Sequence, residues 1–255
     1  MPQVEYEVRD RVAYITMNRP EKLNAMSHEM LQGLWDAFTN LRDDDQVWLG
    51  IVTGAGKAFS VGHDLMEMRT SGKMADPTGS TDELYLFMAT QITKPIIAAV
   101  NGICLAQGAG VALGADIRVA SETVQFGWPQ AKRGISSISG PVILGQRIPI
   151  GKALEILLTG DFITATEALE LGLINHVVPP SELMPKTMEI ATKILANAPL
   201  AVRGMKAATL RGMDKPLTER LEIATQIYDG LQDTADAKEG LTAFLEKRDS
   251  VFRGN

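Results

Sequence analysis

The sequence predicts an α/β fold with mostly parallel strands, followed by a helical C-terminal region. Up to about Ser181, short apolar segments bounded by glycine, proline or asparagine alternate with segments of helical periodicity. Beyond Ser181 the strand signals stop, and the remaining segments are amphipathic helices. Strands that alternate with helices are typical of a parallel sheet covered by helices.

Six segments are predicted to be strands. They are residues 4–10, 11–18, 47–54, 96–103, 117–121 and 176–178. Asp10 separates the first two strands and suits a tight turn between them. The segment VWLGIVTG, residues 47–54, is apolar enough for a strand that is buried on both faces.

The first predicted helix begins after Ser27, whose hydroxyl can accept a hydrogen bond from an N–H of the first turn. The apolar residues that follow at helical spacing are Met30, Leu31, Leu34, Phe38 and Leu41. Further helices are predicted around residues 111–116 and 151–160, between the later strands.

A later helix is predicted to begin at Thr164, because Thr164 and Glu167 have the spacing of a capping box. Gly172 is well placed to end this helix. Four amphipathic helices are expected after it, within residues 181–199, 200–213, 216–232 and 236–249. Residues 68–83 are the most loop-like stretch of the chain.

Composition narrows the classes of function. The 255 residues carry a net charge of −6 and show no basic face, which argues against nucleic acid as a partner. No apolar run is long enough to predict a membrane span. The single cysteine, Cys104, cannot form an internal disulfide, and the N-terminus lacks the pattern of a signal peptide. We therefore expect a cytoplasmic protein.

Several chemistries fit the sequence poorly. Gly108, Gly110 and Gly114 are closely spaced, but a dinucleotide-binding loop needs its acidic residue about 20 positions further on, and Asp116 follows too soon. No G-x-S-x-G nucleophile motif is present. The three histidines lack any zinc-ligand spacing, so no metal site is expected.

Two glycine-bearing segments, VGHDL (61–65) and LAQGAG (105–110), each follow an apolar strand. Two backbone N–H groups from such segments can converge on one oxygen and form an oxyanion hole. The alternative is that both segments are ordinary tight turns, and the residues alone leave this open.

The chain resembles the enoyl-CoA hydratase/isomerase family, the crotonase superfamily. The matching pieces, in order, are ITMNRPEKLNAMS, GIVTGAGKAFSVGHDL, TKPIIAAVNGICLAQGAGVALGADIRVAS, QFGWPQAKRGI, LLTGDFITATEALELGLINHVV, APLAVRGMK and EGLTAFLEKRDSVF. The resemblance implies a spiral of ββα turns over residues 1–195 and a helical oligomerisation module over 196–255. It also implies a homotrimer or hexamer and an acyl-CoA substrate that carries its own CoA, so that no separate cofactor is expected.

The resemblance also assigns site residues. The two oxyanion amides belong to His63 and Gln107, or to Gly108 if the register slips by one, and Gly62 lets the chain turn before His63. The remaining residues implied in CoA or thioester binding are Lys22, Leu23, Ala25, Asp64, Leu65, Met66 and, in an adenine pocket, Phe252. Asp64 is also expected to hold its own turn by bonding backbone amides.

The sequence departs from the family pattern at both acid/base positions. Hydratases of the family carry two glutamates, and the corresponding residues here are Gly110 and Gln130, neither of which transfers a proton. A general acid or base contributes about 10²–10⁴ in rate, so we expect weak hydration of a simple enoyl-CoA. Gln130 can still orient a water or a carboxylate.

Other groups can supply chemistry in place of the glutamates. Histidine is the side chain whose ordinary pKa lies nearest neutral pH, so the His63 ring is a candidate acid or base. The run Ser136, Ser137 and Ser139 can bind a carboxylate or a water, and Glu83 and Tyr85 can approach the acyl pocket.

Two alternative functions remain open. FS-x-GHD, LINHVV and EGLTAFLEKR also resemble methylmalonyl-CoA decarboxylases of the family, which suggests a decarboxylase or another lyase of a carboxylated acyl-CoA. The second alternative is a non-catalytic acyl-CoA-binding protein.

Overall fold

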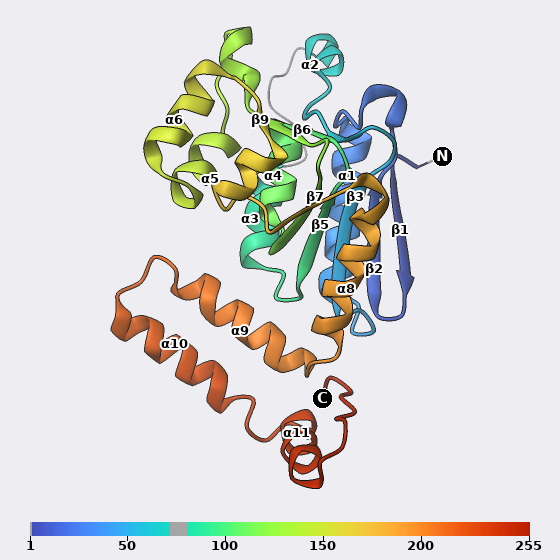
Figure 1. Cartoon of the computed structure of the whole chain (residues 1–255), viewed down its shortest axis with the longest axis vertical. Coiled ribbons are helices and arrows are strands. Elements are labelled where there is room, and N and C mark those ends of the chain that lie inside the picture. Colours follow the sequence, from blue (N-terminus) through green and yellow to red (C-terminus); the bar gives the residue numbers. More distant parts are fainter. Residues whose placement is uncertain (1, 72–80) are drawn as a thin grey trace.

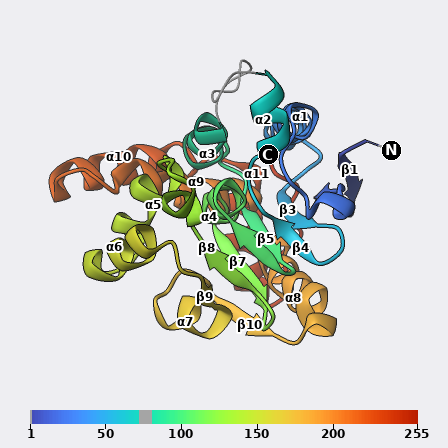
Figure 2. The same cartoon turned by 90° about the horizontal axis from the view of Figure 1, so that it is seen from above.

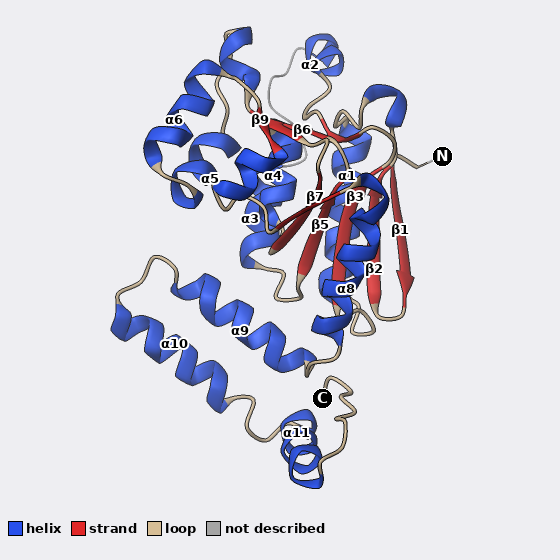
Figure 3. Cartoon of the chain, viewed as in Figure 1, coloured by secondary structure: helices blue, strands red, loops and turns tan. Residues whose placement is uncertain are grey.

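The computed structural model describes residues 2–71 and 81–255, and it contains two β-sheets with helices packed around them (Figure 3). The larger sheet has the strand order β1-β2-β3-β5-β7-β10, and the smaller has β4-β6-β8-β9. In the larger sheet β1 and β2 are antiparallel and every other pair is parallel. The sequence prediction of mostly parallel pairing is confirmed.

The strands are β1 (Val4–Arg9), β2 (Val12–Met17), β3 (Leu49–Gly54), β4 (Ala58–Ser60), β5 (Ile96–Val100), β6 (Ile103–Leu105), β7 (Ile117–Ser121), β8 (Gln125–Gly127), β9 (Ile163–Thr164) and β10 (His176–Val178). The α-helices are α1 (His28–Asp43), α2 (Leu65–Ser71), α3 (Thr81–Thr90), α4 (Gln107–Gly114), α5 (Ser139–Arg147), α6 (Ile150–Thr159), α7 (Ala165–Glu170), α8 (Leu183–Leu195), α9 (Pro199–Gly212), α10 (Leu217–Asp229) and α11 (Ala235–Glu246). Short 3₁₀ helices are η1 (Pro20–Lys22), η2 (Pro129–Arg133) and η3 (Pro180–Glu182).

The chain advances as a spiral of ββα turns. The successive pairs β3–β4, β5–β6 and β7–β8 each give their first strand to the larger sheet and their second strand to the smaller one, and helices follow each pair. Strands β4, β6 and β8 are parallel neighbours. The segments that leave these three strands therefore emerge at one edge of the smaller sheet.

Helices cover both faces of the larger sheet (Figures 1 and 2). Alternate residues of β2 enter different cores: Ala13 and Ile15 pack in the large cluster that contains α1, α3 and α4, whereas Val12 packs with Leu183 and Ala191 of α8. This period-2 division of one strand between two cores explains why the central strands are almost wholly apolar.

Local signals in the sequence are borne out at the helix ends and turns. Asp10 and Arg11 both have positive φ, at 48° and 66°, in the turn between β1 and β2, which is the backbone of a type I′ hairpin turn. Ser27 accepts a hydrogen bond from the Met30 amide. Thr164 forms the predicted capping box with its partner three residues on, and Gly172 has φ +73° just after α7.

Other predictions were wrong in their boundaries. The single strand predicted over 96–103 is two strands in different sheets, β5 and β6, with Asn101 and Gly102 at the corner between them. A Cβ on Gly102 would collide with the Lys57 carbonyl, so only glycine permits this corner. The glycine-rich LAQGAG segment is mostly helix, because α4 begins at Gln107 and not near residue 111.

The segment 68–83, predicted as a loop, is helical at both ends, since α2 reaches Ser71 and α3 begins at Thr81. Residues 72–80 lie outside the described part of the chain. Helix α5 begins at Ser139, within the serine run for which no helix was predicted.

The four predicted C-terminal helices are present as α8 to α11. Helix α8 packs on the sheet, whereas α9 to α11 extend beyond it (Figure 1). Lys206 of α9 binds Asp116 at 2.7 Å and so joins α9 to the start of β7. Division of the chain into units 1–195 and 196–255 stays a prediction. Within the described residues, no helix is long and apolar enough to cross a membrane.

Lys94, just before β5, is a buried cation with 3% of its surface exposed. Its ammonium donates to the Asp44 carbonyl at 2.6 Å. Burial, with Arg203 adding repulsion, lowers the pKa of Lys94 to about 8. The unfolded chain keeps this proton up to the ordinary lysine pKa, so stability attributable to Lys94 rises between about pH 8 and pH 10.5.

Replacing Lys94 with methionine is expected to remove this pH dependence. Relative to Lys94→Met, the wild type should gain on the order of 1–3 kcal/mol in the free energy of unfolding between pH 7 and pH 10.5. Urea unfolding of the wild type and of Lys94→Met at the two pH values measures the difference in the free energy of unfolding. The pH effects of the other titratable groups are common to both proteins and cancel in this difference. A difference that is constant with pH would contradict the assignment.

Candidate functional site

The main cavity, about 790 Å³, lies where the segments leaving β4, β6 and β8 meet. Its walls are formed by residues 22, 25, 61, 63–66, 105–107, 129, 130 and 133–138. Most of the surface inside is apolar, with a few polar groups among it. A largely apolar cavity with a small number of convergent polar groups is the usual form of a small-molecule site.

The wall that carries Lys22 and Ala25 is held by a buried asparagine. Asn24, fully buried with φ +55°, donates to the carbonyls of Ala55 and Ala58 and accepts from the Arg19 amide. Asparagine tolerates this left-handed backbone better than most residues. Its three bonds fix the 19–25 segment against β4.

Asp64 plays the structural role that the sequence predicted. It binds Arg19 at 2.7 Å and accepts from the backbone amides of Met66 and Glu67. Burial alone would raise the pKa of Asp64, but these hydrogen bonds outweigh it and keep the pKa below its usual value. Asp64 is therefore an ionised anchor at neutral pH.

The turn at Gly62 orients the His63 backbone. Gly62 has φ +86°, its carbonyl accepts from the Met26 amide at 2.8 Å, and the Asp64 amide donates to the Met26 carbonyl at 3.0 Å. The Gly62 carbonyl and the His63 N–H belong to one trans peptide group and point in opposite directions, so the His63 N–H points away from Met26. His63 itself borders the main cavity.

Gln107 lies against this turn. A Cβ on Gly62 would stand 3.2 Å from the Gln107 nitrogen and 2.8 Å from the Ala106 Cβ. Ala106, with φ 53° and ψ −120°, holds the chain in a conformation that is rare outside glycine, and Gln107 begins α4 immediately after it. Such backbone strain, on the order of 1–3 kcal/mol, is typical of functional sites. The amides of His63 and Gln107 thus belong to one corner of the main cavity.

Gly108 makes the approach of α4 to β4 possible. A Cβ at this position would collide with the Ser60 carbonyl oxygen and would lie 2.8 Å from the Ser60 Cβ. Gly108 therefore lies behind the cavity wall, whereas Gln107 lines the cavity. Of the two candidates for the second oxyanion amide, Gln107 is the one that borders the cavity.

The two positions that lack glutamate differ in their surroundings. A side chain on Gly110 would meet Ser139 and the Gln107 Oε1, at 3.2–3.4 Å. Gln130 borders the main cavity, and its Oε1 is buried without a hydrogen-bond partner in the described residues. Among the described residues that line the cavity, Asp64 is the one carboxylate, and Arg19 holds it.

Most of the predicted site residues lie together. Those that line the main cavity are Lys22, Ala25, His63, Asp64, Leu65, Met66, Gln107, Gln130 and Ser137. Gly62, Gly108 and Gly110 lie behind the wall, and Leu23 is an exposed residue beside it. The Ser137 hydroxyl accepts from the Gly140 amide at 3.2 Å, which gives it a structural role as well.

Phe252 lies apart from this group. It packs near Gly240 of α11, 3.6 Å from the position of a Cβ there, and does not line the main cavity of its own chain. The Tyr85 ring packs near Gly114 and is also absent from the lining, while the Glu83 side chain lies outside the described part.

Sequence reasoning missed Arg133, which lines the cavity from the last position of η2. It also missed the buried contact between Ser139 Oγ and the indole N–H of Trp128, which donates to it at 3.4 Å. The sequence does contain a signal for Arg133: it follows Gln130 by three positions, and residues three apart lie on the same face of a 3₁₀ helix.

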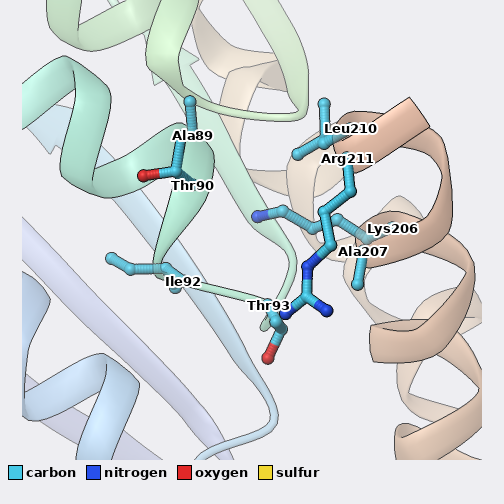
Figure 4. A pocket seen from close by; sticks show the side chains of 8 residues that line it. All are labelled: Ala89, Thr90, Ile92, Thr93, Lys206, Ala207, Leu210 and Arg211. Carbon is cyan, nitrogen blue, oxygen red and sulfur yellow. The ribbon is translucent and has the colours of Figure 1, made fainter. Parts of the chain in front are cut away.

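A second hollow lies between the end of α3 and α9 (Figure 4). It measures about 70 Å³, an order of magnitude less than the main cavity. Lys206 and Arg211 of α9 border it, but Lys206 is bound to Asp116. Cys104 is buried, which raises the pKa of its thiol well above the usual range. The described residues contain no acid, histidine or cysteine cluster suited to a metal.

Comparison with known proteins identifies the class. Residues 7–255 match the family model of the enoyl-CoA hydratase/isomerase family. The chain is similar in structure to the enoyl-CoA hydratase from Bacillus anthracis, with a TM-score of 0.93, 34% identity, and coverage of 99% of this chain and 100% of that one. The chain belongs to the enoyl-CoA hydratase/isomerase family, in the crotonase superfamily.

Two curated relatives cover nearly the whole chain. The (E)-benzylidenesuccinyl-CoA hydratase of Thauera aromatica is 36% identical over 253 residues, 98% of this chain and 99% of its own. The crotonyl-CoA hydratase of Syntrophomonas wolfei is 37% identical over 249 residues, 96% of each chain. The chain thus matches these enzymes from end to end.

Gly108→Ala is expected to lower the free energy of unfolding by about 1–3 kcal/mol, because the added methyl overpacks the contact with Ser60. Gly151→Ala is the matched control: nothing lies within 4 Å of a Cβ at this helical position. Because Gly151 lies in the first turn of α6 and not in its interior, this change should be neutral or stabilise the protein by up to about 0.5 kcal/mol. Urea unfolding of the two variants measures both, and equal effects would contradict the close approach.

Proposed function

We propose that this protein binds an acyl-CoA thioester and stabilises its enolate with the backbone amides of His63 and Gln107. The observation that carries the proposal is the contact of the Gly62 turn with the Gln107 amide at one corner of the main cavity. Two amides aimed at a thioester oxygen stabilise the negative charge that develops there. Removing one such donor typically lowers rate by about 10²–10³.

The rest of the cavity supports this assignment. Lys22 lies on the wall built by the 19–25 segment, where its ammonium can meet the phosphates of CoA. The apolar remainder suits an acyl chain. Because both amides belong to the backbone, stabilisation of the enolate does not depend on a cofactor. We propose that the protein uses no cofactor other than the CoA that the substrate carries.

Hydration of a simple enoyl-CoA is proposed to be weak. It requires a base to take a proton from water and an acid to protonate the enolate carbon. Gly110 and Gln130 supply neither, and Asp64 is held ionised by Arg19. His63 is the one imidazole on the cavity wall among the described residues. A single acid/base group in place of two glutamates is expected to give a slower reaction.

The test is hydration of crotonyl-CoA, followed by the mass gain of one water. The value of kcat/KM should be at least about 100-fold below that of the Syntrophomonas wolfei crotonyl-CoA hydratase assayed in parallel. Equal rates would contradict the proposal. Gly110→Glu combined with Gln130→Glu should raise the rate if the missing carboxylates are the cause. Binding of the thioester without turnover on any acyl group would favour a non-catalytic acyl-CoA-binding protein.

We propose that the protein works as a homotrimer or a hexamer in the cytoplasm. Helices α10 and α11 expose large apolar side chains, among them Leu217, Phe244 and Leu245, each more than 70% exposed. Apolar surface of this extent on a helical region commonly marks an interface. Light scattering should give three or six times the chain mass of 27.6 kDa. A monomer would contradict this part of the proposal.

A further inference from the structure

Gln130 and Arg133 form one edge of the main cavity. Both belong to η2, a 3₁₀ helix, in which side chains three positions apart lie on the same face. Both line the cavity that contains His63 and Gln107. A guanidinium and a carboxamide therefore belong to one wall of the proposed site.

Arg133 has no acidic partner among the described residues. Its neighbour Lys132 binds Asp161 at 2.6 Å, and the carboxylate on the cavity wall, Asp64, binds Arg19 at 2.7 Å. Arg133 borders the main cavity together with Asp64, and a neighbouring hollow together with Asp161, and each of these acids is engaged by another cation. Arg133 is an exposed residue that lines the main cavity, so its charge is available to a ligand there.

The amide of Gln130 adds a donor beside this charge. Its Oε1 is fully buried and has no hydrogen-bond partner among the described residues. Its Nε2 makes no hydrogen bond to the described residues either, but it is not fully buried. The NH₂ group is therefore accessible from the space that Gln130 lines, which includes the main cavity. A guanidinium fork next to an amide N–H matches the two oxygens of a carboxylate.

We propose that the acyl group of the substrate carries a second carboxylate, which Arg133 and Gln130 bind. This inference rests on the proposed function, since it places the thioester oxygen at the His63 and Gln107 amides. Arg133 then selects carboxylated acyl-CoA thioesters over neutral ones of the same length. Lys22, on a different segment, remains available for the CoA phosphates.

The experiment compares binding of succinyl-CoA and butyryl-CoA by calorimetry, because the two differ by a carboxylate in place of a methyl group. Glutaryl-CoA and pentanoyl-CoA repeat the comparison with one more methylene. The wild type should bind the carboxylated thioester of at least one pair about tenfold or more tightly than its neutral partner, as expected for one charge-assisted contact.

Arg133→Gln should reduce this preference to within about twofold, by weakening binding of the carboxylated thioester more than binding of the neutral one. Lys132→Gln is the matched control, since it removes the same charge from the adjacent position, outside the main cavity, and should keep the preference. Far-ultraviolet circular dichroism and the unfolding midpoint of both variants establish that they are folded.

Three results would overturn the inference. Equal binding of both members of both pairs by the wild type shows that no carboxylate is selected. Equal weakening of neutral and carboxylated thioesters by Arg133→Gln shows that Arg133 binds a CoA phosphate. Loss of the preference in Lys132→Gln shows a general charge effect. Failure of all four thioesters to bind overturns the proposed function as well, so the two failures are distinguishable.

Discussion

The site depends on the close approach of two backbones, the turn at Gly62 and the first turn of α4. Gly108 allows α4 to rest on the Ser60 carbonyl, and Gly62 allows the turn to lie against Ala106. A side chain at either glycine would separate the two amides that the site brings to one corner. The strain at Ala106 is offset by the surrounding structure, including the bond from its amide to the Gly127 carbonyl.

The spiral explains why this approach occurs. Each ββα turn adds a parallel strand to the smaller sheet, so the residues after β4, β6 and β8 leave the sheet at the same edge. His63, Gln107 and Gln130 are far apart in sequence, but each follows one of these strands by two or three residues. The strands are only three residues long, yet they determine where His63, Gln107 and Gln130 lie.

The sequence predicted the elements that carry long periodic patterns, such as α1 and the C-terminal helices, and the capped end at Thr164. It missed β4, β6 and β8, which are too short to show periodicity, although it predicted the equally short β10. The sequence did not predict the start of α4, because glycines are unfavourable in helices. Gly108 is present there because of a tertiary contact, the close approach of α4 to Ser60. His63 and Gln107 came from the family resemblance, because an amide site has no side-chain signature. Arg133 was missed because its proximity to Gln130 depends on a 3₁₀ turn.

Replacement of two carboxylates by Gly110 and Gln130 changes the electrostatics of the site as well as its acid/base chemistry. Two charges 4 Å apart interact by about 1–4 kcal/mol at the effective dielectric constants of water and of protein surfaces. Glutamates at these positions would therefore repel an anionic acyl group. Without them, the charge that η2 brings to the cavity wall is the cation Arg133, which no described acid engages. In the proposed function, the two substitutions that are expected to weaken hydration would also make an anionic acyl group easier to bind, so one physical cause would account for both proposed properties.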